Sequence, residues 1–215
     1  MAVRAMVFDI GRVLFDWRPE RLYAELIPDA AERERFFTQL CPPEWNLAFD
    51  AGRDMPRGVE EDAAKAADPR DASLIRAWWT RWPDMVGPQF EGSVACFRAL
   101  KARGVPVYGL TNFAAETYPI AEEMFPILRE FDLCVVSGRE GCVKPQPRIY
   151  EILEQRTGHA PRELFFADDS APNVAAARAR GWTAHLFEGA PGLARALGEV
   201  GLLPADQAAA LEGAG

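Results

Sequence analysis

The sequence is poor in the residues that mark several common classes of protein. Its four cysteines are scattered and form no C-x-x-C pair, which argues against a disulfide scaffold and against a thiolate zinc site. Basic residues are also scarce, since 24 Lys and Arg stand against 32 Asp and Glu and give a formal net charge of −8. A chain with this charge repels polyanions, so we expect no nucleic-acid partner.

Long hydrophobic runs are missing as well. No stretch is long enough to span a bilayer, and no cationic leader precedes an apolar segment near the start. We therefore expect no membrane partner and a location in the cytoplasm. Of the 215 residues, 49% are hydrophobic, which suffices for one sizeable core or for a core with a small appendage. The sequence leaves the oligomeric state open.

Short apolar runs alternate with amphipathic segments through most of the chain. Five of the runs predict strands: "VRAMVFD", "VPVYGLT", "FDLCVVS", "ELFFADD" and "TAHLF". Helical spacing predicts helices over residues 88–104, 114–125, 147–157 and 171–181. This pattern is typical of an α/β protein with a Rossmann-like parallel sheet and helices on both faces. Right-handed crossovers then place the carboxyl ends of all strands at one edge.

Residues 17–87 break the alternation, because their apolar residues recur at helical spacing with no obvious strand. We interpret them as a helical domain inserted after the first strand, with residues 1–16 and 88–215 forming the α/β core. The charged, proline-interrupted stretch 54–73 predicts a solvated helix pair and loop. Trp78, Trp79 and Trp82 are expected to build its core, and Trp45 is our candidate for contact with a substrate.

Polar residues stand at or just beyond the ends of four predicted strands: Asp9, Thr111 with Asn112, Lys144, and Asp168 with Asp169. Carboxylates that converge at one sheet edge repel unless a cation lies between them, and hard oxygen ligands suit Mg²⁺. Each residue alone could be an ordinary turn or helix cap. Their occurrence at successive strand ends favours a site for an anionic group bound with a divalent cation.

Four segments, in order, resemble the motifs of the haloacid dehalogenase-like (HAD) hydrolases: "VFDIG", "GLTN", "VKPQPRIY" and "FFADDSAPNVAAARARG". The resemblance covers nearly the whole chain, and the inserted segment is similar to the mobile cap of the family's subfamily I. It implies that residues 48–56 face the active site, and we expect the cap to hinge near residues 15–18 and 86–90.

The same resemblance assigns roles to residues. Asp9 is the expected nucleophile and forms an aspartyl ester or aspartyl phosphate. Lys144 is the second expected catalytic residue and steadies the charges around Asp9. The expected substrate contacts come from Thr111, Asn112, Arg12 and Trp45. Mg²⁺ is expected on Asp9, the Gly11 backbone carbonyl, Asp169 and the adjacent Asp168.

Gly11 departs from the phosphatase pattern, which usually has a second aspartate, the general acid and base, two residues after the nucleophile. Three interpretations follow. The chain is a Mg²⁺-dependent phosphatase of a small phosphorylated metabolite, similar to sugar-phosphate phosphatases whose first motif reads D-x-G. Alternatively it is a metal-independent 2-haloacid dehalogenase, whose leaving halide needs no proton. The third alternative is a catalytically weak or inactive binding protein with the same fold.

Overall fold

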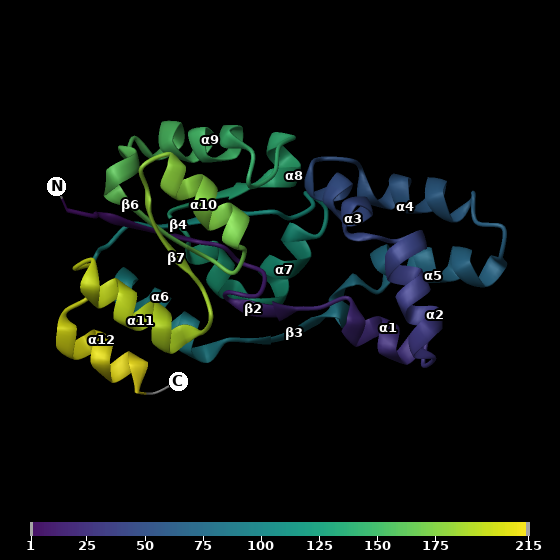
Figure 1. Ribbon diagram of the computed structural model, residues 1–215, viewed down its shortest axis with the longest axis horizontal. Coiled ribbons are helices and arrows are strands. Elements are labelled where there is room, and N and C mark those ends of the chain that lie inside the picture. Colours follow the sequence, from purple (N-terminus) through teal and green to yellow (C-terminus); the bar gives the residue numbers. More distant parts are fainter. Residues whose placement is uncertain (1, 214–215) are drawn as a thin grey trace.

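The computed structural model describes residues 2–213, and these fold as the predicted α/β protein with a parallel sheet between two layers of helices (Figure 1). The sheet has the strand order β5-β4-β1-β6-β7. Its strands are β1 (Ala5–Phe8), β4 (Val107–Thr111), β5 (Leu133–Val136), β6 (Leu164–Asp168) and β7 (Thr183–Leu186). Each coincides with one of the five predicted apolar runs, although each strand is shorter than its run by one to three residues.

Strand β1 lies at the centre of the sheet, and its four residues are fully buried. Val7 is in register with Tyr108 of β4 on one side and with Phe166 of β6 on the other. A strand that is paired on both sides and covered on both faces needs a continuous apolar sequence, which explains the run "AMVF". The charged residue that follows this run therefore stands at the middle of the sheet edge.

Side chains of β1 alternate between two hydrophobic layers. Met6 and Phe8 belong to the larger apolar cluster, and Ala5 and Val7 belong to the smaller one. The larger cluster is covered by α6 (Glu91–Ala102), α7 (Tyr118–Met124), α11 (Ala190–Glu199) and α12 (Ala205–Glu212). The smaller cluster is covered by α9 (Pro147–Thr157) and α10 (Ala171–Ala179). Helix α9 ends at Gly158, whose φ of +72° is the left-handed conformation that stops a helix.

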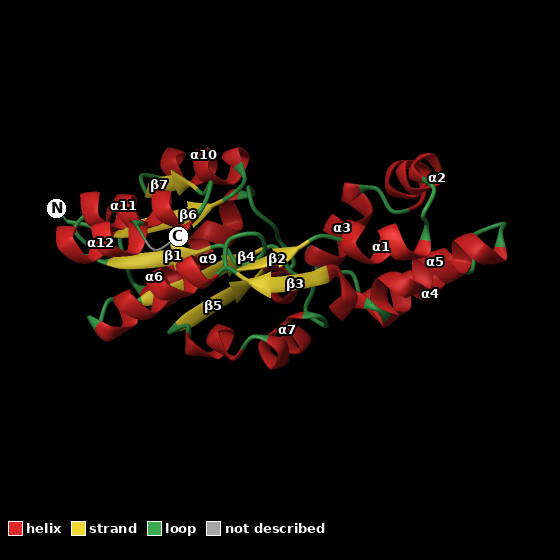
Figure 2. Cartoon of the chain, turned by 90° about the horizontal axis from the view of Figure 1, so that it is seen from below, coloured by secondary structure: helices red, strands yellow, loops and turns green. Residues whose placement is uncertain are grey.

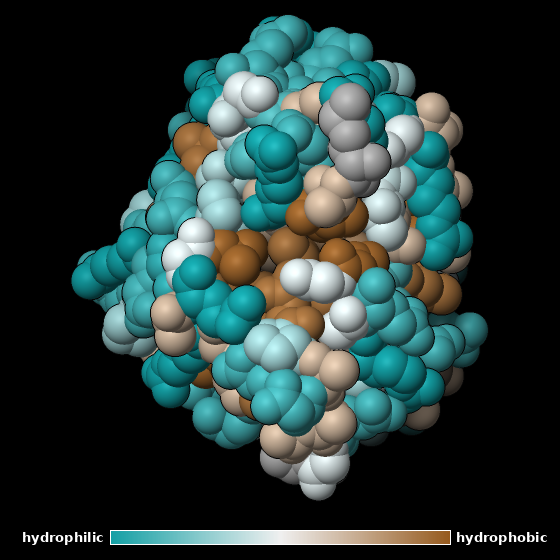
Figure 3. Space-filling model, turned by 90° about the vertical axis from the view of Figure 1, so that its left-hand side faces the viewer, coloured by the Kyte–Doolittle hydropathy of each residue, from teal (hydrophilic) through white to brown (hydrophobic). Residues whose placement is uncertain are grey.

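Short elements complete the core. They are η3 (Pro126–Glu130), α8 (Ser137–Glu140) and η4 (Pro161–Glu163). The end of the core at which β1 begins, opposite the inserted helical segment, is shown in Figure 3. Hydrophobic atoms gather there in a hollow surrounded by hydrophilic ones. In the described part of the chain, no helix has the length and apolar character needed to cross a membrane.

The helical segment lies between two short antiparallel strands, β2 (Phe15–Trp17) and β3 (Val86–Gln89). This ribbon connects the sheet with a separate group of helices (Figure 2). The helices are α1 (Glu20–Leu26), α2 (Ala30–Arg35), η1 (Phe36–Leu40), α3 (Pro43–Asp50), α4 (Met55–Ala63), α5 (Pro69–Thr80) and η2 (Trp82–Met85). The predicted domain boundaries, and the predicted hinges, fall on the ribbon.

Two helix predictions differ from the structure. The helix predicted from residue 88 begins at Glu91, because Gln89 is the last residue of β3 and pairs with Phe15. The helix predicted from residue 114 begins at Tyr118, after a turn that follows β4. Both errors concern short segments whose conformation depends on partners that are distant in the sequence.

Candidate active site

Asp9 directly follows β1, and its backbone N–H continues the sheet by donating to the carbonyl of Ala167 at 2.9 Å. The side chain is buried, with 8% of the residue exposed. Its Oδ1 accepts hydrogen bonds from the backbone N–H of Ile10 at 2.7 Å and from Lys144 Nζ at 2.7 Å. Both contacts are made to Oδ1, which leaves Oδ2 for chemistry. Burial is the main reason that the pKa of Asp9 is raised to about 7.

Lys144 bridges two strand ends. Its Nζ lies 2.7 Å from Asp9 Oδ1 and 2.7 Å from Asp168 Oδ2, and the residue is only 3% exposed. Burial by itself lowers the pKa of Lys144, but the two carboxylates outweigh this effect and raise it above its ordinary value. The ammonium group therefore stays charged and holds the ends of β1 and β6 together.

Asn112 fixes the backbone that presents this lysine. Its Oδ1 accepts from the Lys144 backbone N–H at 2.7 Å, and its Nδ2 donates to the Lys144 carbonyl at 3.0 Å. The sequence predicted that the Asn112 amide binds substrate, whereas the structure uses the amide to position Lys144. Thr111, the last residue of β4, is 1% exposed and lies beside Asn112 at the same edge.

Asp168 is fully buried, and both of its oxygens have partners besides Lys144. Asn173 Nδ2 donates to each of them at 3.1 Å, and the backbone N–H of Ser170 donates to Oδ1 at 2.8 Å. Sequence reasoning missed Asn173, which lies in the first turn of α10, five residues after Asp168. Asp168 is thus held rigidly as a partner for Lys144.

The three aspartates converge. One carboxylate oxygen from each of Asp9, Asp168 and Asp169 lies within 4.8 Å of the other two. Burial raises the pKa of Asp169, which Arg12 opposes from 3.3 Å. Three carboxyl groups face two cationic side chains, Lys144 and Arg12, so their full ionisation leaves an excess of one negative charge. An all-oxygen donor set with excess negative charge fits Mg²⁺. Asp9 and Asp169 are the residues that would hold it, because Asp168 is already saturated.

Arg12 is placed by an unusual backbone. Its φ of +62° lies in the left-handed region, which non-glycine residues rarely adopt. Its Nε lies 3.3 Å from Asp169 Oδ2, and the side chain is largely exposed. Arg12 and Asp169 line a cavity of about 500 Å³ that is distinct from the one beside Gly11.

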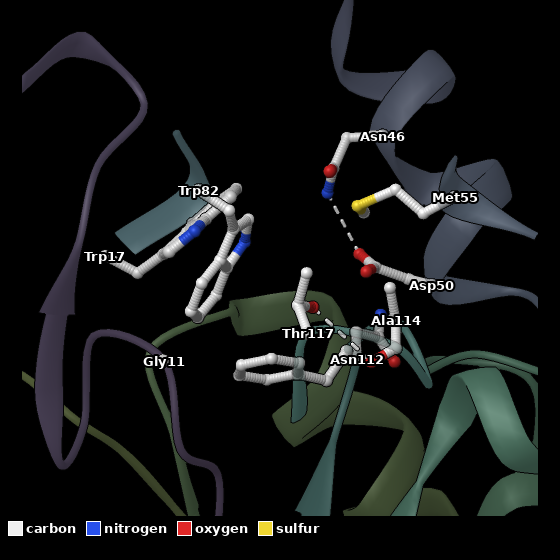
Figure 4. A pocket seen from close by; sticks show the side chains of 10 residues that line it. Gly11, Trp17, Asn46, Asp50, Met55, Trp82, Asn112, Ala114 and Thr117 are labelled. Atoms are coloured by element: carbon white, nitrogen blue, oxygen red, sulfur yellow. Dashed lines mark hydrogen bonds between the residues drawn. The ribbon is translucent and has the colours of Figure 1, made fainter. Parts of the chain in front are cut away.

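The cavity beside Gly11 lies between the sheet edge and the helical segment (Figure 4). Trp17 and Trp82 stand together on one side, and Asn46, Met55 and Asp50 project from the opposite side. Its lining is completed by Asn112, Phe113, Ala114 and Thr117. The free volume is about 60 Å³, enough for a few water molecules.

Trp45, the predicted substrate contact, does not line this cavity. Its indole N–H donates to Asp62 Oδ2 at 2.8 Å, and its ring packs on Phe49 and Trp78 inside the helical segment. Trp82, which the sequence assigned to the interior of that segment, packs on Phe113 and forms part of the cavity wall. Sequence reasoning also missed Asp50, although it lies in the stretch 48–56 that was expected to face the site.

The geometry at the strand ends matches what a family comparison finds independently. A model of the haloacid dehalogenase-like hydrolases matches residues 3–181. The chain belongs to this family. The four motifs recognised in the sequence therefore belong to a HAD hydrolase, and the parallel sheet is the HAD core.

Relatives of this HAD hydrolase include a phosphatase. The sesquiterpene phosphatase astK of Aspergillus oryzae is 28% identical over 178 residues, which cover 83% of this chain and 86% of that protein. A HAD family enzyme of Bacteroides thetaiotaomicron, solved in complex with magnesium and inorganic phosphate, superposes with a TM-score of 0.63. It is 20% identical, with 87% of this chain and 95% of the other covered.

A HAD-like hydrolase of Porphyromonas gingivalis superposes with a TM-score of 0.68 at 19% identity. That superposition covers 92% of this chain and 98% of the other. At such identities the structural likenesses show the shared fold. The family match shows a hydrolase, and the phosphatase astK supports phosphate-ester chemistry in coarse terms.

Proposed function

We propose that this HAD hydrolase is a Mg²⁺-dependent phosphatase that acts through an aspartyl phosphate on Asp9. The observation that carries the proposal is the buried Lys144, whose Nζ lies 2.7 Å from a carboxylate oxygen of both Asp9 and Asp168. Such a lysine favours the ionised form of Asp9 against the effect of burial and orients its carboxylate, as a nucleophile requires. Asp169 nearby gives the cluster the additional carboxylate that a cation site needs.

Each residue of the site has a separate role in the proposed reaction. Asp9 Oδ2 attacks phosphorus while Oδ1 stays bound to Ile10 N–H and Lys144. Lys144 also compensates the charge on the phosphate oxygens as the bond to the leaving group breaks. Thr111 and the backbone after β4, which end the strand next to β1, would bind phosphate oxygens. Asp9 and Asp169 would hold Mg²⁺, which would supply the charge compensation that lets a phosphate dianion approach a carboxylate.

The cavity indicates the kind of ester. Trp17, Trp82, Met55 and Phe113 present apolar surface to it. The polar side chains of the wall already have partners, since Asn46 bonds to Asp50 and Trp78, Asn112 to the Lys144 backbone, and Thr117 to the Ala114 carbonyl. A sugar would need several free hydrogen-bonding partners. We infer that the substrate is a small phosphate monoester with an apolar organic group. The name of the relative astK, a sesquiterpene phosphatase, supports a substrate of this kind.

Substrate entry requires the helical segment to move. The cavity of about 60 Å³ is too small for an ester with an organic group of more than a few atoms. We propose that the segment acts as a cap that opens about the β2–β3 ribbon and excludes bulk water when it closes. The cytoplasmic location, the absence of nucleic-acid and membrane partners, and the insertion of the cap as a domain stay predictions.

A single panel tests the function. Phosphate release is measured with isoprenoid, aryl and sugar monophosphates, with Mg²⁺ and with excess EDTA, beside halide release from 2-chloropropionate. We expect Mg²⁺-dependent phosphate release, fastest with an apolar ester. Metal-independent halide release without phosphate release would establish the dehalogenase alternative. Inactivity on the whole panel would favour the binding-protein alternative.

A further inference from the structure

The wall of the cavity beside Gly11 has a carboxyl group with no role yet in the proposed phosphatase reaction. Asp50, the last residue of α3, lines the same cavity as Gly11 and Asn112 (Figure 4). Phosphate-ester cleavage needs a proton for the departing oxygen, and Gly11 has no side chain to supply it. Of the described residues that line this cavity, Asp50 is the one with a carboxyl group.

We propose that Asp50, contributed by the helical segment, is the catalytic acid and base of the proposed phosphatase reaction. In the first step, Asp9 Oδ2 bonds to phosphorus, the ester P–O bond breaks, and the departing oxygen takes the proton of Asp50. In the second step, the Asp50 carboxylate takes a proton from water, whose oxygen bonds to phosphorus. The bond from phosphorus to Asp9 then breaks, which releases inorganic phosphate and restores both carboxyl groups.

The contacts of Asp50 hold it toward the sheet edge. Asn46 Nδ2 donates to Asp50 Oδ2 at 3.1 Å, and the backbone N–H of Ala114, just after β4, donates to the same carboxyl group. The hydroxyl of Ser137, at the start of α8, donates to the Asp50 backbone carbonyl. Asp50 is thus tied to two elements of the core, although it belongs to the helical segment.

Two glycines allow this close approach. Gly52 has a φ of +100°, and a Cβ there would lie 3.2 Å from the carbonyl oxygen of Gly138. At Gly138 itself, a Cβ would lie 2.5 Å from the backbone nitrogen of Ala115. The loop after α3 can therefore pack directly on α8, and α8 on the turn after β4, which brings Asp50 to the cavity wall.

The surroundings suit a group that gains and loses a proton near neutral pH. Burial raises the pKa of Asp50 to about 7, against smaller opposing effects of Lys144 and the Ala114 N–H. Asp50 also ends a helix, where the dipole disfavours negative charge. On the adjoining elements, Glu140 of α8 pairs with Arg156, Arg139 of α8 lies over the Tyr118 ring, and Arg53 pairs with Asp62. Glu116, in the turn after β4, has one buried carboxylate oxygen without a hydrogen-bond partner.

The test compares the Mg²⁺-loaded wild-type protein with Asp50→Asn on aryl phosphates of increasing leaving-group basicity. A basic leaving group needs the proton most, so we expect kcat/KM to fall about 10²–10⁴-fold for an alkyl or 4-methoxyphenyl ester. For 4-nitrophenyl phosphate, whose leaving group needs little help, we expect less than a tenfold fall in kcat/KM. In the wild type, kcat/KM for the basic ester should decline above about pH 7. In Asp50→Asn, this decline at alkaline pH should be absent.

A second readout detects the base. Without Asp50, water attacks the aspartyl phosphate slowly, so Asp50→Asn should release 4-nitrophenol in a burst. Intact mass should then show a phosphoryl group on the protein, which is absent from the Asp9→Asn/Asp50→Asn double variant. A variant that had only misplaced the helical segment would lose the first step equally for every ester and show no burst.

A rescue variant and a matched control complete the design. A Cβ at Gly11 has its nearest neighbour, Trp17 Cβ, at 4.0 Å, so a side chain fits there. With basic leaving groups, the Gly11→Asp/Asp50→Asn double variant should have a kcat/KM at least tenfold above that of Asp50→Asn. Asp54→Asn is the control, because Asp54 caps α4 through the Arg57 N–H and does not line the cavity.

The outcomes separate two failures. Suppose that the wild-type protein releases phosphate but that Asp50→Asn lowers kcat/KM by the same factor for all esters. Asp50 then only positions the segment, so its role as acid and base is wrong while the proposed function stands. The same conclusion follows if Asp50→Asn retains full activity on basic esters. If the wild-type protein releases no phosphate from any ester, the proposed function fails, and this inference fails with it.

Discussion

The α/β core and the helical segment between β2 and β3 hold their charges in opposite ways. In the core, the Lys144 side chain is 1% exposed and lies between Asp9 and a fully buried Asp168. In the helical segment, Arg76 pairs with Glu60 at 2.7 Å, but their side chains are 43% and 60% exposed. A buried ion pair cannot exchange its partner for water without a large cost, whereas an exposed pair can. The core thus presents a rigid site, and the segment's surface charges place little constraint on its position.

Asp50 departs from this pattern, because it is a largely buried carboxyl group in the segment that carries exposed charges. Its hydrogen bonds reach Asn46 in its own helix and Ala114 in the core. The charged groups therefore fall into three classes. Buried pairs such as Lys144 with Asp168 fix the site, and exposed pairs such as Arg76 with Glu60 only keep a surface solvated. Asp50 is the third class, a group in the helical segment that contacts the core. Each class predicts a different response to substitution.

The largest effect is expected at the nucleophile. Asp9→Asn replaces an anionic oxygen with an amide, so turnover should fall on the order of 10⁵-fold or more. The amide oxygen can still accept from the Ile10 N–H, so the fold should be retained. Phosphate release and far-ultraviolet circular dichroism measure the two quantities. Substantial residual activity in this variant would rule out covalent catalysis by Asp9.

The next largest effect is expected at the bridge between the strands. Lys144→Met leaves the fully buried Asp168 without its cationic partner, which should lower the free energy of unfolding by about 3–5 kcal/mol. Urea denaturation at pH 7 measures the change. Lys101→Met is the matched control, since Lys101 pairs with the partly exposed Asp132 and should cost far less. Equal losses in the two variants would contradict the contrast between buried and exposed pairs.

A smaller, pH-dependent effect is expected at Asp50. Its pKa is about 7 in the folded protein, against an ordinary value of 3.8, so the unfolded chain loses this proton first as the pH rises. Ionisation therefore favours unfolding, and stability is lost between these two pKa values. As the pH rises from 5 to 8, the stability of Asp50→Asn, which cannot ionise, should increase relative to that of the wild type by about 2–3 kcal/mol. Urea titrations at both pH values test this, and Asp54→Asn should show no such difference.

The smallest effect is expected on the surface of the helical segment. Glu60→Gln breaks an exposed pair with Arg76, and salt and water already screen that pair. The melting temperature should stay within the error of differential scanning calorimetry, and turnover should be unchanged. A clear loss of stability would show that the exposed network constrains the segment after all.

Local signals account for much of what the sequence predicts correctly. The five strands are predictable because strands buried on both faces need continuous apolar runs, and the strand-end residues Asp9, Lys144 and Asp169 stand out as charges beside them. Strands β2 and β3 carry little signal of their own, since Phe15 and Gln89 pair only because the chain returns from the helical segment. The same reason explains why the role of Asn112, which depends on Lys144 32 residues away, was not predictable.

By itself, the sequence determined the fold family and the set of charged groups at the carboxyl ends of the strands, because periodicity and motif order are properties of the chain. Only the tertiary structure decided which of these groups meet and what faces them. It placed Trp45 inside the helical segment, brought Trp82 to the cavity wall, and set Asp50 opposite Gly11. Those assignments depend on how two regions pack against each other, and packing is decided by long-range contacts that no local pattern encodes.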